Sequence, residues 1–270
     1  MNYSTAKSEK FDCIIFKLSP LVMKRAVAIV SGKGGTGKSF VTCNTAVILA
    51  GAGFKTLVID ADITMASVEI MYGINPRKTL QDIILGNAKA EEVIHEGPNG
   101  VLVAPAGARL KKRLRASELD SAINSIVNAV FPDFLLIDAA AGLDAEVVMA
   151  AEIAGNFLIV CNPEITSLAD AYKVKSVLGS RSRFIGTVLN RIGRVRILGE
   201  RISRILGPLI ASIPEDPRVR ETIDCGVPYV LTHRESIVTK QLFKVASAIA
   251  GVELYPEKEK GLLGFLRRKG

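Results

Sequence analysis

The feature that most constrains this chain is a glycine-rich stretch, Ser31 to Ser39, that reads S-G-K-G-G-T-G-K-S. It satisfies the phosphate-binding pattern G-x-x-x-x-G-K-[ST]. The run 25–30 before it (R-A-V-A-I-V) is typical of a buried parallel strand, and 39–50 after it reads as a helix. A strand, a loop and a helix in this order predict an α/β fold with a phosphate site at the helix N-terminus. A glycine-rich turn that binds nothing is the simpler alternative.

The loop offers several kinds of phosphate contact. Its glycines let the backbone approach phosphate oxygens closely, and the helix N-terminus directs N–H groups at them. Lys38 brings a positive charge to the β- and γ-phosphates, and the hydroxyl of Ser39 is a ligand for Mg²⁺. We therefore predict that a nucleotide is bound by Gly32, Lys33, Gly34, Gly35, Thr36, Gly37, Lys38 and Ser39.

A second lysine distinguishes this loop from most phosphate-binding loops. Lys33 directly precedes two glycines, giving K-G-G-T-G-K-S. This resembles the deviant Walker A box of the MinD/ParA family of dimeric P-loop ATPases. The resemblance implies that ATP and Mg²⁺ are the cofactors, that ATP lies between two subunits, and that Lys33 acts catalytically on the nucleotide of the other subunit. A solvated lysine in a generic phosphate loop is the alternative interpretation.

Two further apolar runs end in carboxylates. The run 55–59 precedes D-A-D at 60–62, and the run 133–137 precedes Asp138. The carboxyl ends of parallel strands face the crevice where doubly wound sheets bind ligands. By resemblance, Asp62 is catalytic and orients the attacking water from the switch I loop, while Asp138, the Walker B position, holds Mg²⁺ through a water molecule. An aspartate at a strand end is otherwise often a turn former.

One segment departs from the family pattern. Family members usually read D-[ST]-P-A-G after this strand, whereas this chain reads D-A-A-A-G at 138–142. Gly142 is retained, so its N–H is expected to meet the γ-phosphate. Without the proline, which fixes φ, we expect a looser switch II loop, which affects hydrolysis and its coupling more than nucleotide binding.

Motifs farther along the chain follow the order of the family. The run 156–160 leads into C-N-P-E-I-T-S-L-A-D at 161–170, which resembles a segment near the dimer face. The run 184–189 leads into Asn190, whose amide is implied to contact adenine. The segment I-P-E-D at 213–216 resembles the loop that closes over the base. These motifs add Asn190, Arg191, Pro214 and Asp216 to the predicted nucleotide site.

Apolar strands alternate with helical stretches from about 25 to 250. We therefore predict a doubly wound, mostly parallel sheet with helices on both faces. The expected divisions are an N-terminal extension (1–22), an ATPase domain (23–252) and a C-terminal tail (253–270). Met23 directly precedes the first strand, so we hypothesise that translation starts there and not at Met1. No two cysteines form C-x-x-C, which argues against zinc sites and against the related iron–sulfur scaffold ATPases.

The C-terminal segment 258–270 reads K-E-K-G-L-L-G-F-L-R-R-K-G. On a helical wheel its large apolar residues share one arc fringed by cations, the pattern of an interfacial amphipathic helix that meets anionic headgroups. It resembles the membrane-targeting tail of MinD proteins. Gly261 and Gly264 weaken the helix, so we expect one tail to bind marginally and two tails in an ATP dimer to bind better. A frayed basic terminus is the alternative.

The net charge of +8 supports a second candidate surface. Basic clusters occur at 109–115 and among the arginines of 181–204. ParA-type relatives bind DNA non-specifically as ATP dimers, and clustered cations suffice for phosphate contacts. A third reading, a nucleotide-binding interaction module with little hydrolysis, follows from the alanines after Asp138.

The combined pattern favours an ATP-dependent dimerising switch of the MinD type. We predict that it is cytoplasmic, works peripherally at the inner face of the cell membrane through residues 258–270, and positions division or another cargo. The resemblance also implies an activating protein, which the sequence does not identify.

Overall fold

The computed structural model describes residues 13–15, 25–63, 65–107, 115–193 and 199–256. Its strands are β1 (Cys13–Ile15), β2 (Arg25–Ser31), β3 (Thr56–Asp60), β4 (His95–Glu96), β5 (Leu102–Ala104), β6 (Phe134–Ala141), β7 (Asn156–Cys161), β8 (Arg183–Ile192), β9 (Leu209–Pro214) and β10 (Leu254–Pro256). Its helices are α1 (Lys38–Gly51), α2 (Val68–Met71), α3 (Leu80–Ile84), α4 (Ala116–Val130), α5 (Ala145–Ala154), α6 (Ile165–Leu178), α7 (Gly199–Leu206), α8 (Arg218–Asp224), α9 (Tyr229–Thr232) and α10 (Ile237–Ala250). Short 3₁₀ turns span Ala90–Val93 and Pro98–Gly100.

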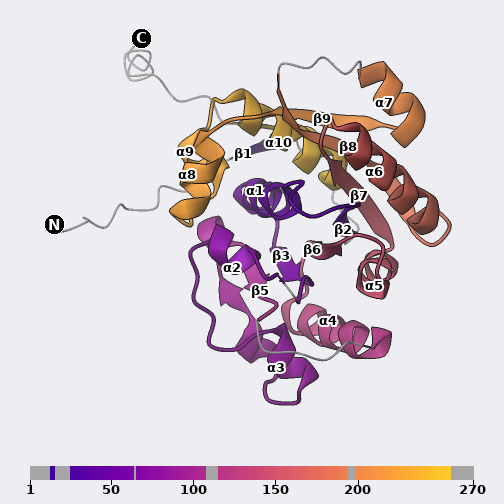
Figure 1. Ribbon diagram of the computed structural model, residues 1–270. Coiled ribbons are helices and arrows are strands. Elements are labelled where there is room, and N and C mark those ends of the chain that lie inside the picture. Colours follow the sequence, from indigo (N-terminus) through magenta and orange to yellow (C-terminus); the bar gives the residue numbers. More distant parts are fainter. Residues whose placement is uncertain (1–12, 16–24, 64, 108–114, 194–198, 257–270) are drawn as a thin grey trace, which may run out of the picture.

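Eight strands form one sheet in the order β4-β5-β3-β6-β2-β7-β8-β9. All neighbours in it are parallel except the edge strand β4, which is antiparallel to β5. Helices lie on both sides of the sheet (Figure 1). The predicted fold class, a doubly wound and mostly parallel sheet, is therefore confirmed.

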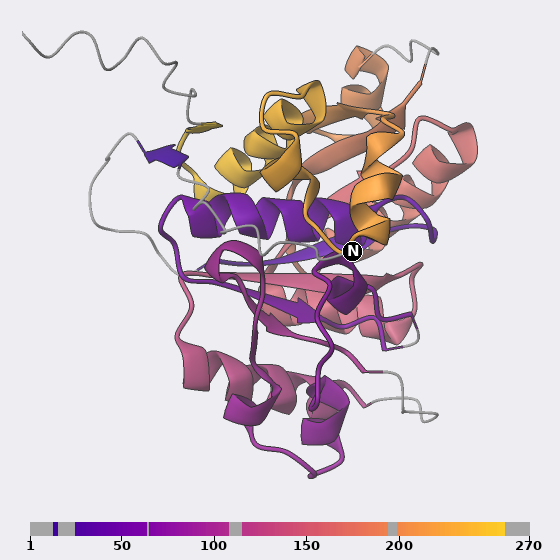
Figure 2. The same cartoon turned by 90° about the vertical axis from the view of Figure 1, so that its left-hand side faces the viewer.

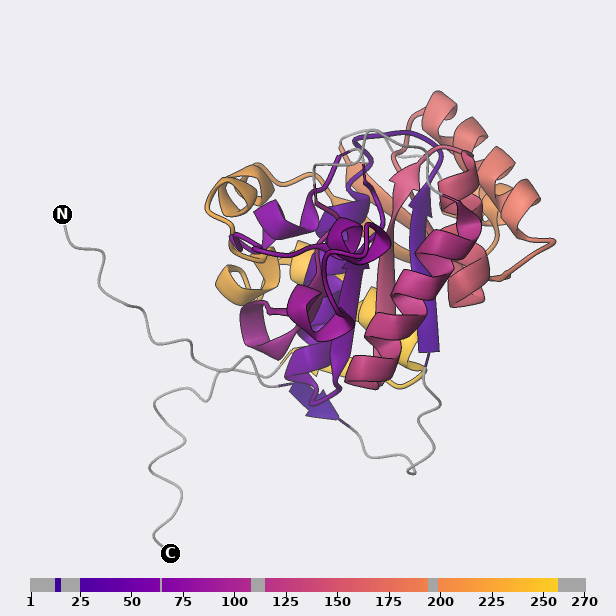
Figure 3. The ribbon, with the colours of Figure 1, turned by 90° about the horizontal axis from the view of Figure 1, so that it is seen from below.

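The two faces of the sheet bury two separate cores. In β2, Val27 and Ile29 face the core shared with α1 and α10, while Ala28 and Val30 face the core shared with α4, α5 and α6. This alternation follows from the two-residue period of a strand. Figures 2 and 3 show the strands running between these helical layers. Because both faces are covered, the central strands read as continuous apolar runs in the sequence.

β6 is longer than the sequence predicts. The apolar run ends before Asp138, but the strand continues to Ala141, which is the register partner of Ser31 in β2. The alanines keep backbone N–H groups that can join the sheet ladder, whereas a proline has none. They therefore extend the strand where the sequence predicts a looser loop.

A small second sheet joins the two ends of the described chain. β1 pairs antiparallel with β10, with Cys13 opposite Pro256 and Ile15 opposite Leu254. A part of the segment predicted as an N-terminal extension (1–22) thus pairs with a strand at the start of the segment predicted as the C-terminal tail (253–270). The domain limits and the Met23 start stay predictions. Within the described ranges no helix is long and apolar enough to cross a membrane, and the predicted tail helix at 258–270 lies outside them.

Candidate nucleotide-binding site

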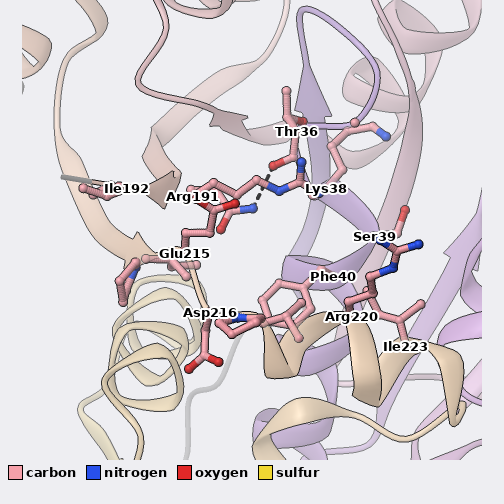
Figure 4. A pocket seen from close by; sticks show the side chains of 18 of the residues that line it. Thr36, Lys38, Ser39, Phe40, Arg191, Ile192, Glu215, Asp216, Arg220 and Ile223 are labelled. Atoms are coloured by element: carbon pink, nitrogen blue, oxygen red, sulfur yellow. Dashed lines mark hydrogen bonds between the residues drawn. The ribbon is translucent and has the colours of Figure 1, made fainter. Parts of the chain in front are cut away.

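The phosphate loop, residues 31–39, joins β2 to α1. Its backbone turns through left-handed conformations at Gly35 (φ 74°) and Gly37 (φ 91°), which glycine adopts without strain. Asn190 in β8 holds the loop, because its amide nitrogen Nδ2 donates to the carbonyl of Thr36 at 2.8 Å (dashed in Figure 4). A Cβ at Gly37 would lie 2.2 Å from the same nitrogen. The loop is therefore shaped by its own glycines and by a side chain of a strand two positions away in the sheet.

A cavity of about 1130 Å³ lies beside this loop. Its walls come from the phosphate loop, the start of α1, the end of β8, the β9–α8 connection and α8, with Met71 of α2 at one side. Figure 4 shows Lys38, Arg191 and Asp216 among the side chains around it. The cavity is somewhat larger than the ~300–1,000 Å³ of common small-molecule pockets. The cations Lys38 and Arg191 suit charged phosphates, and apolar lining residues such as Phe40 and Ile213 suit the flat base of a nucleotide.

Most of the predicted nucleotide-binding residues line this cavity: Gly35, Thr36, Gly37, Lys38, Ser39, Asn190, Arg191, Pro214 and Asp216. Gly32, Lys33, Gly34 and Gly142 are not among its lining residues. Gly32 instead packs on α6, because a Cβ there would lie 2.5 Å from the backbone carbon of Asp170. The N–H of Gly142 donates to the carbonyl of Ser31 at 2.9 Å, so a phosphate contact through that N–H requires this bond to break.

Asp216 stabilises the loop that the sequence predicts to close over the base. Its carboxylate accepts hydrogen bonds from the guanidinium of Arg218 and, at 2.9 Å, from the hydroxyl of Tyr229. The hydrogen bond from Arg218 lowers the pKa of Asp216 well below its usual range. The side chain of Asp216 is thus engaged with its own loop and α9 at the cavity wall.

Two carboxylates face each other across neighbouring strands. Asp60 at the end of β3 is the register partner of Asp138 in β6, and both residues are fully buried. Burial and the charge of Asp138 raise the pKa of Asp60 to about 8. Burial also raises the pKa of Asp138, while the positive charge of Lys38 lowers it. A nearby cation would favour the ionised form of both groups.

Asp138 fits the predicted metal role. The hydroxyl of Thr42 donates to its Oδ1 at 3.1 Å, whereas Oδ2 is buried without a hydrogen-bond partner among the described atoms. An unpartnered buried oxygen is costly, and a hydrated cation would satisfy it. Across the described ranges, no group of three or more His, Cys, Asp or Glu could hold a metal by itself. Mg²⁺ suits such a site, because it keeps several waters and also takes phosphate oxygens as ligands.

Sequence reasoning missed the role of Asp60. Its carboxylate accepts backbone hydrogen bonds from Asp62 (3.0 Å), Ser67 (3.0 Å) and Val68 (3.1 Å). It therefore fixes both ends of the loop that carries Asp62. The motif D-A-D at 60–62 contains both carboxylates, but the sequence alone does not show which of the two is buried. Asp62 lies in the loop, where its Oδ1 accepts from the N–H of Met65 at 3.0 Å.

Lys33 is held within its own chain. Its Nζ forms an ion pair of 2.5 Å with Glu164, which stands at the N-cap position of α6. The two side chains are 33% and 60% exposed, so both face solvent. Lys33 must exchange this partner before it can contact a nucleotide of another subunit.

The chain is similar to known nucleotide-binding proteins over most of its length. The ParA family model, described as NUBPL iron-transfer P-loop NTPase, matches residues 22–250. An uncharacterized ATP-binding protein of Methanocaldococcus jannaschii is 37% identical over 256 residues, covering 92% of this chain and 96% of that protein.

Solved structures give the same result. The cell division ATPase MinD of Pyrococcus furiosus has a TM-score of 0.77 and 38% identity, covering 85% of this chain and 99% of that chain. The septum site-determining protein MinD of Pyrococcus horikoshii, complexed with Mg-ADP, has a TM-score of 0.77 and 34% identity, covering 92% and 100%. The family resemblance predicted from the loop with Lys33 and Lys38 is thereby confirmed. The chain belongs to the MinD/ParA family of P-loop ATPases.

Proposed function

We propose that this ATPase is an ATP-dependent dimerising switch. The observation that carries the proposal is a set of exposed apolar side chains around the phosphate loop, here called the apolar rim: Met65 (76% exposed), Leu143 (39%) and Ile165 (85%). They follow β3, β6 and β7, and the phosphate loop follows β2 between the last two. Because these parallel strands end at one edge, the apolar rim and the phosphate loop lie together on the surface at that edge of the sheet. A second copy of this chain would cover it.

Within the dimer we assign the roles that the sequence predicts. Lys38 and the loop N–H groups bind the ATP phosphates, while Ser39 and Asp138 hold Mg²⁺, which when bound neutralises charge on the phosphates. Asn190, Arg191, Pro214 and Asp216 form the base end of the site. Mg-ADP in the Pyrococcus horikoshii protein supports this choice of cofactor.

Hydrolysis is assigned to two residues. Asp62 orients a water that attacks the γ-phosphorus while the bond to the leaving ADP oxygen breaks. Lys33 leaves Glu164 and stabilises the charge on the nucleotide of the other subunit. An Asp62→Ala variant should therefore bind ATP, hydrolyse it slowly and accumulate as a dimer.

Sedimentation equilibrium tests the dimer directly. The Asp62→Ala protein should be dimeric with Mg-ATP and monomeric with Mg-ADP. Ile165→Asp in the apolar rim should abolish the dimer while the protein still binds nucleotide. Ile205→Asp is the matched control, because Ile205 is also exposed (52%) but lies at the far end of α7. A dimer that survives Ile165→Asp as well as Ile205→Asp would reject this face as the interface.

Membrane binding by the C-terminal segment is proposed as the second step of the switch. β10 ends at Pro256, two positions before the segment 258–270 begins. We propose that this tail binds anionic lipid at the cytoplasmic face of the membrane and that dimerisation makes binding effective through two tails. Co-sedimentation with anionic vesicles should require both ATP and the tail. Equal supernatant fractions in ATP and ADP, and for a chain ending at Pro256, would discard the membrane surface.

DNA is the second candidate surface, and exposed arginines favour it. Arg183, Arg201 and Arg204 are exposed on β8 and α7, and Arg181 is exposed although it pairs with Glu152. Such cations bind phosphates without reading sequence, so affinity should fall steeply with salt. DNA binding by the ATP dimer at low salt, lost at moderate salt, would support a partition function. Salt-independent absence of binding would remove it.

A further inference from the structure

A hydroxyl of the loop after β3 contacts the predicted metal ligand. The Oγ of Ser67 donates to the Oγ of Ser39 at 2.7 Å. Ser39 belongs to the first turn of α1, and Ser67 directly precedes α2. Both residues are half-buried. The contact therefore joins the phosphate loop to the segment that carries Asp62 and Met65.

Ser67 is held in place by the sheet. Its N–H donates to Oδ2 of Asp60 at 3.0 Å, and the following N–H of Val68 donates to the same oxygen at 3.1 Å. Asp60 is fully buried at the end of β3, so it forms a fixed anchor. These two hydrogen bonds fix the backbone of Ser67, so its hydroxyl starts from a defined position next to Ser39.

The hydrogen-bonding capacity of the Ser39 hydroxyl shows how the contact with Ser67 affects metal binding. A serine oxygen has one hydrogen and two lone pairs. Ser67 occupies one lone pair in this structure, which leaves the other for a cation. The hydroxyl orientation needed for a metal ligand is thereby selected before the metal arrives.

We propose that Ser67 is a positioning residue for Mg²⁺, orienting the Ser39 hydroxyl and coupling metal loading to the loop 61–67. The inference rests on the proposed nucleotide and Mg²⁺ site at the phosphate loop. It adds that binding of the cation affects the loop that bears Asp62 and the apolar-rim residue Met65. Metal loading then orders a catalytic side chain and part of the proposed dimer face together.

The test compares nucleotide affinity with and without the metal. A fluorescent ADP analogue is titrated into full-length protein in Mg²⁺ and in EDTA, and the ratio of the two Kd values gives the metal-dependent gain. Ser67→Ala should reduce this gain about twofold to tenfold, the effect of one hydrogen bond, with the EDTA value unchanged. Ser67→Thr keeps the hydroxyl and should restore the gain. Ser125→Ala, an exposed serine of α4, is the matched control.

Hydrogen exchange gives a readout independent of affinity. Mg²⁺ with ADP should slow amide exchange in segment 61–68 of the wild-type protein, and this response should be lost in Ser67→Ala. An unchanged or larger metal-dependent gain in Ser67→Ala would overturn the positioning role, the larger gain meaning that Ser67 competes with the cation. If the wild-type protein binds no nucleotide in either condition, the proposed function itself fails.

Discussion

Neutralising Glu164 should strengthen the ATP-bound dimer. In the structure Glu164 forms an ion pair with Lys33, the lysine assigned to the nucleotide of the other subunit. Glu164→Gln removes the charge that holds Lys33 in its own chain while keeping the size of the side chain. Lys33 is then released at lower cost when the dimer forms.

The size of the effect follows from exposure. The two side chains are 33% and 60% exposed, so the pair belongs to the solvent-screened class worth about 0.2–1 kcal/mol. Each dimer gives up two such pairs, or about 0.4–2 kcal/mol. Since about 1.4 kcal/mol is a factor of ten, the dimer Kd should fall about twofold to thirtyfold.

The assay is sedimentation equilibrium in Mg-ATP with Asp62→Ala present in both proteins, so that hydrolysis does not dissolve the dimer. Glu152→Gln is the matched control, because it breaks another exposed ion pair, with Arg181, on α5. The increase in dimer affinity caused by Glu164→Gln should be smaller at high salt, because salt screens the ion pair. A weaker dimer would refute the reasoning and show that Glu164 attracts the second subunit, and an unchanged Kd would show that the pair costs nothing to break.

Three further variants test the site. Asn190→Ala removes the amide that donates to Thr36 and should cost about 1–3 kcal/mol of unfolding free energy, measured by denaturant titration, with weaker nucleotide binding. Gly37→Ala places a Cβ at φ 91° and against that amide, so calorimetry should detect no nucleotide binding; binding at wild-type affinity would contradict the geometry. Because the pKa of Asp216 is lowered, its carboxylate stabilises the fold above its ordinary pKa and loses that effect as pH falls. Asp216→Asn should therefore destabilise the protein at pH 7 and progressively less below about pH 4; a difference constant with pH would count against the ion pair.

The sequence predicts those parts of the molecule whose causes are local. The phosphate loop is contiguous, and its glycines, lysine and helix start are all visible within 31–39. The central strands are buried on both faces, so each appears as a short apolar run that needs no knowledge of its neighbours. β6 extends beyond its apolar run because Ala141 pairs with β2, a contact that the run itself does not encode.

Contacts between distant segments could not be predicted in this way. Asn190 holds the carbonyl of Thr36 across 154 positions, and Lys33 pairs with Glu164 across 131. Both contacts depend on the order of strands in the sheet, which places the ends of β2, β7 and β8 next to one another. The family resemblance implied that Asn190 contacts adenine, which stays a prediction, whereas its hydrogen bond to the phosphate loop emerges from the structure.

Gly32 packs so closely on α6 that the phosphate loop and this helix constrain each other's position. A single methyl group does not fit between Gly32 and the backbone of Asp170, so the loop cannot move toward the helix without displacing it. The outer side of α6 exposes Tyr172 (52%) and Val177 (41%). A protein bound to this side of α6 would therefore respond to movements of the phosphate loop, or oppose them, without contacting the cavity.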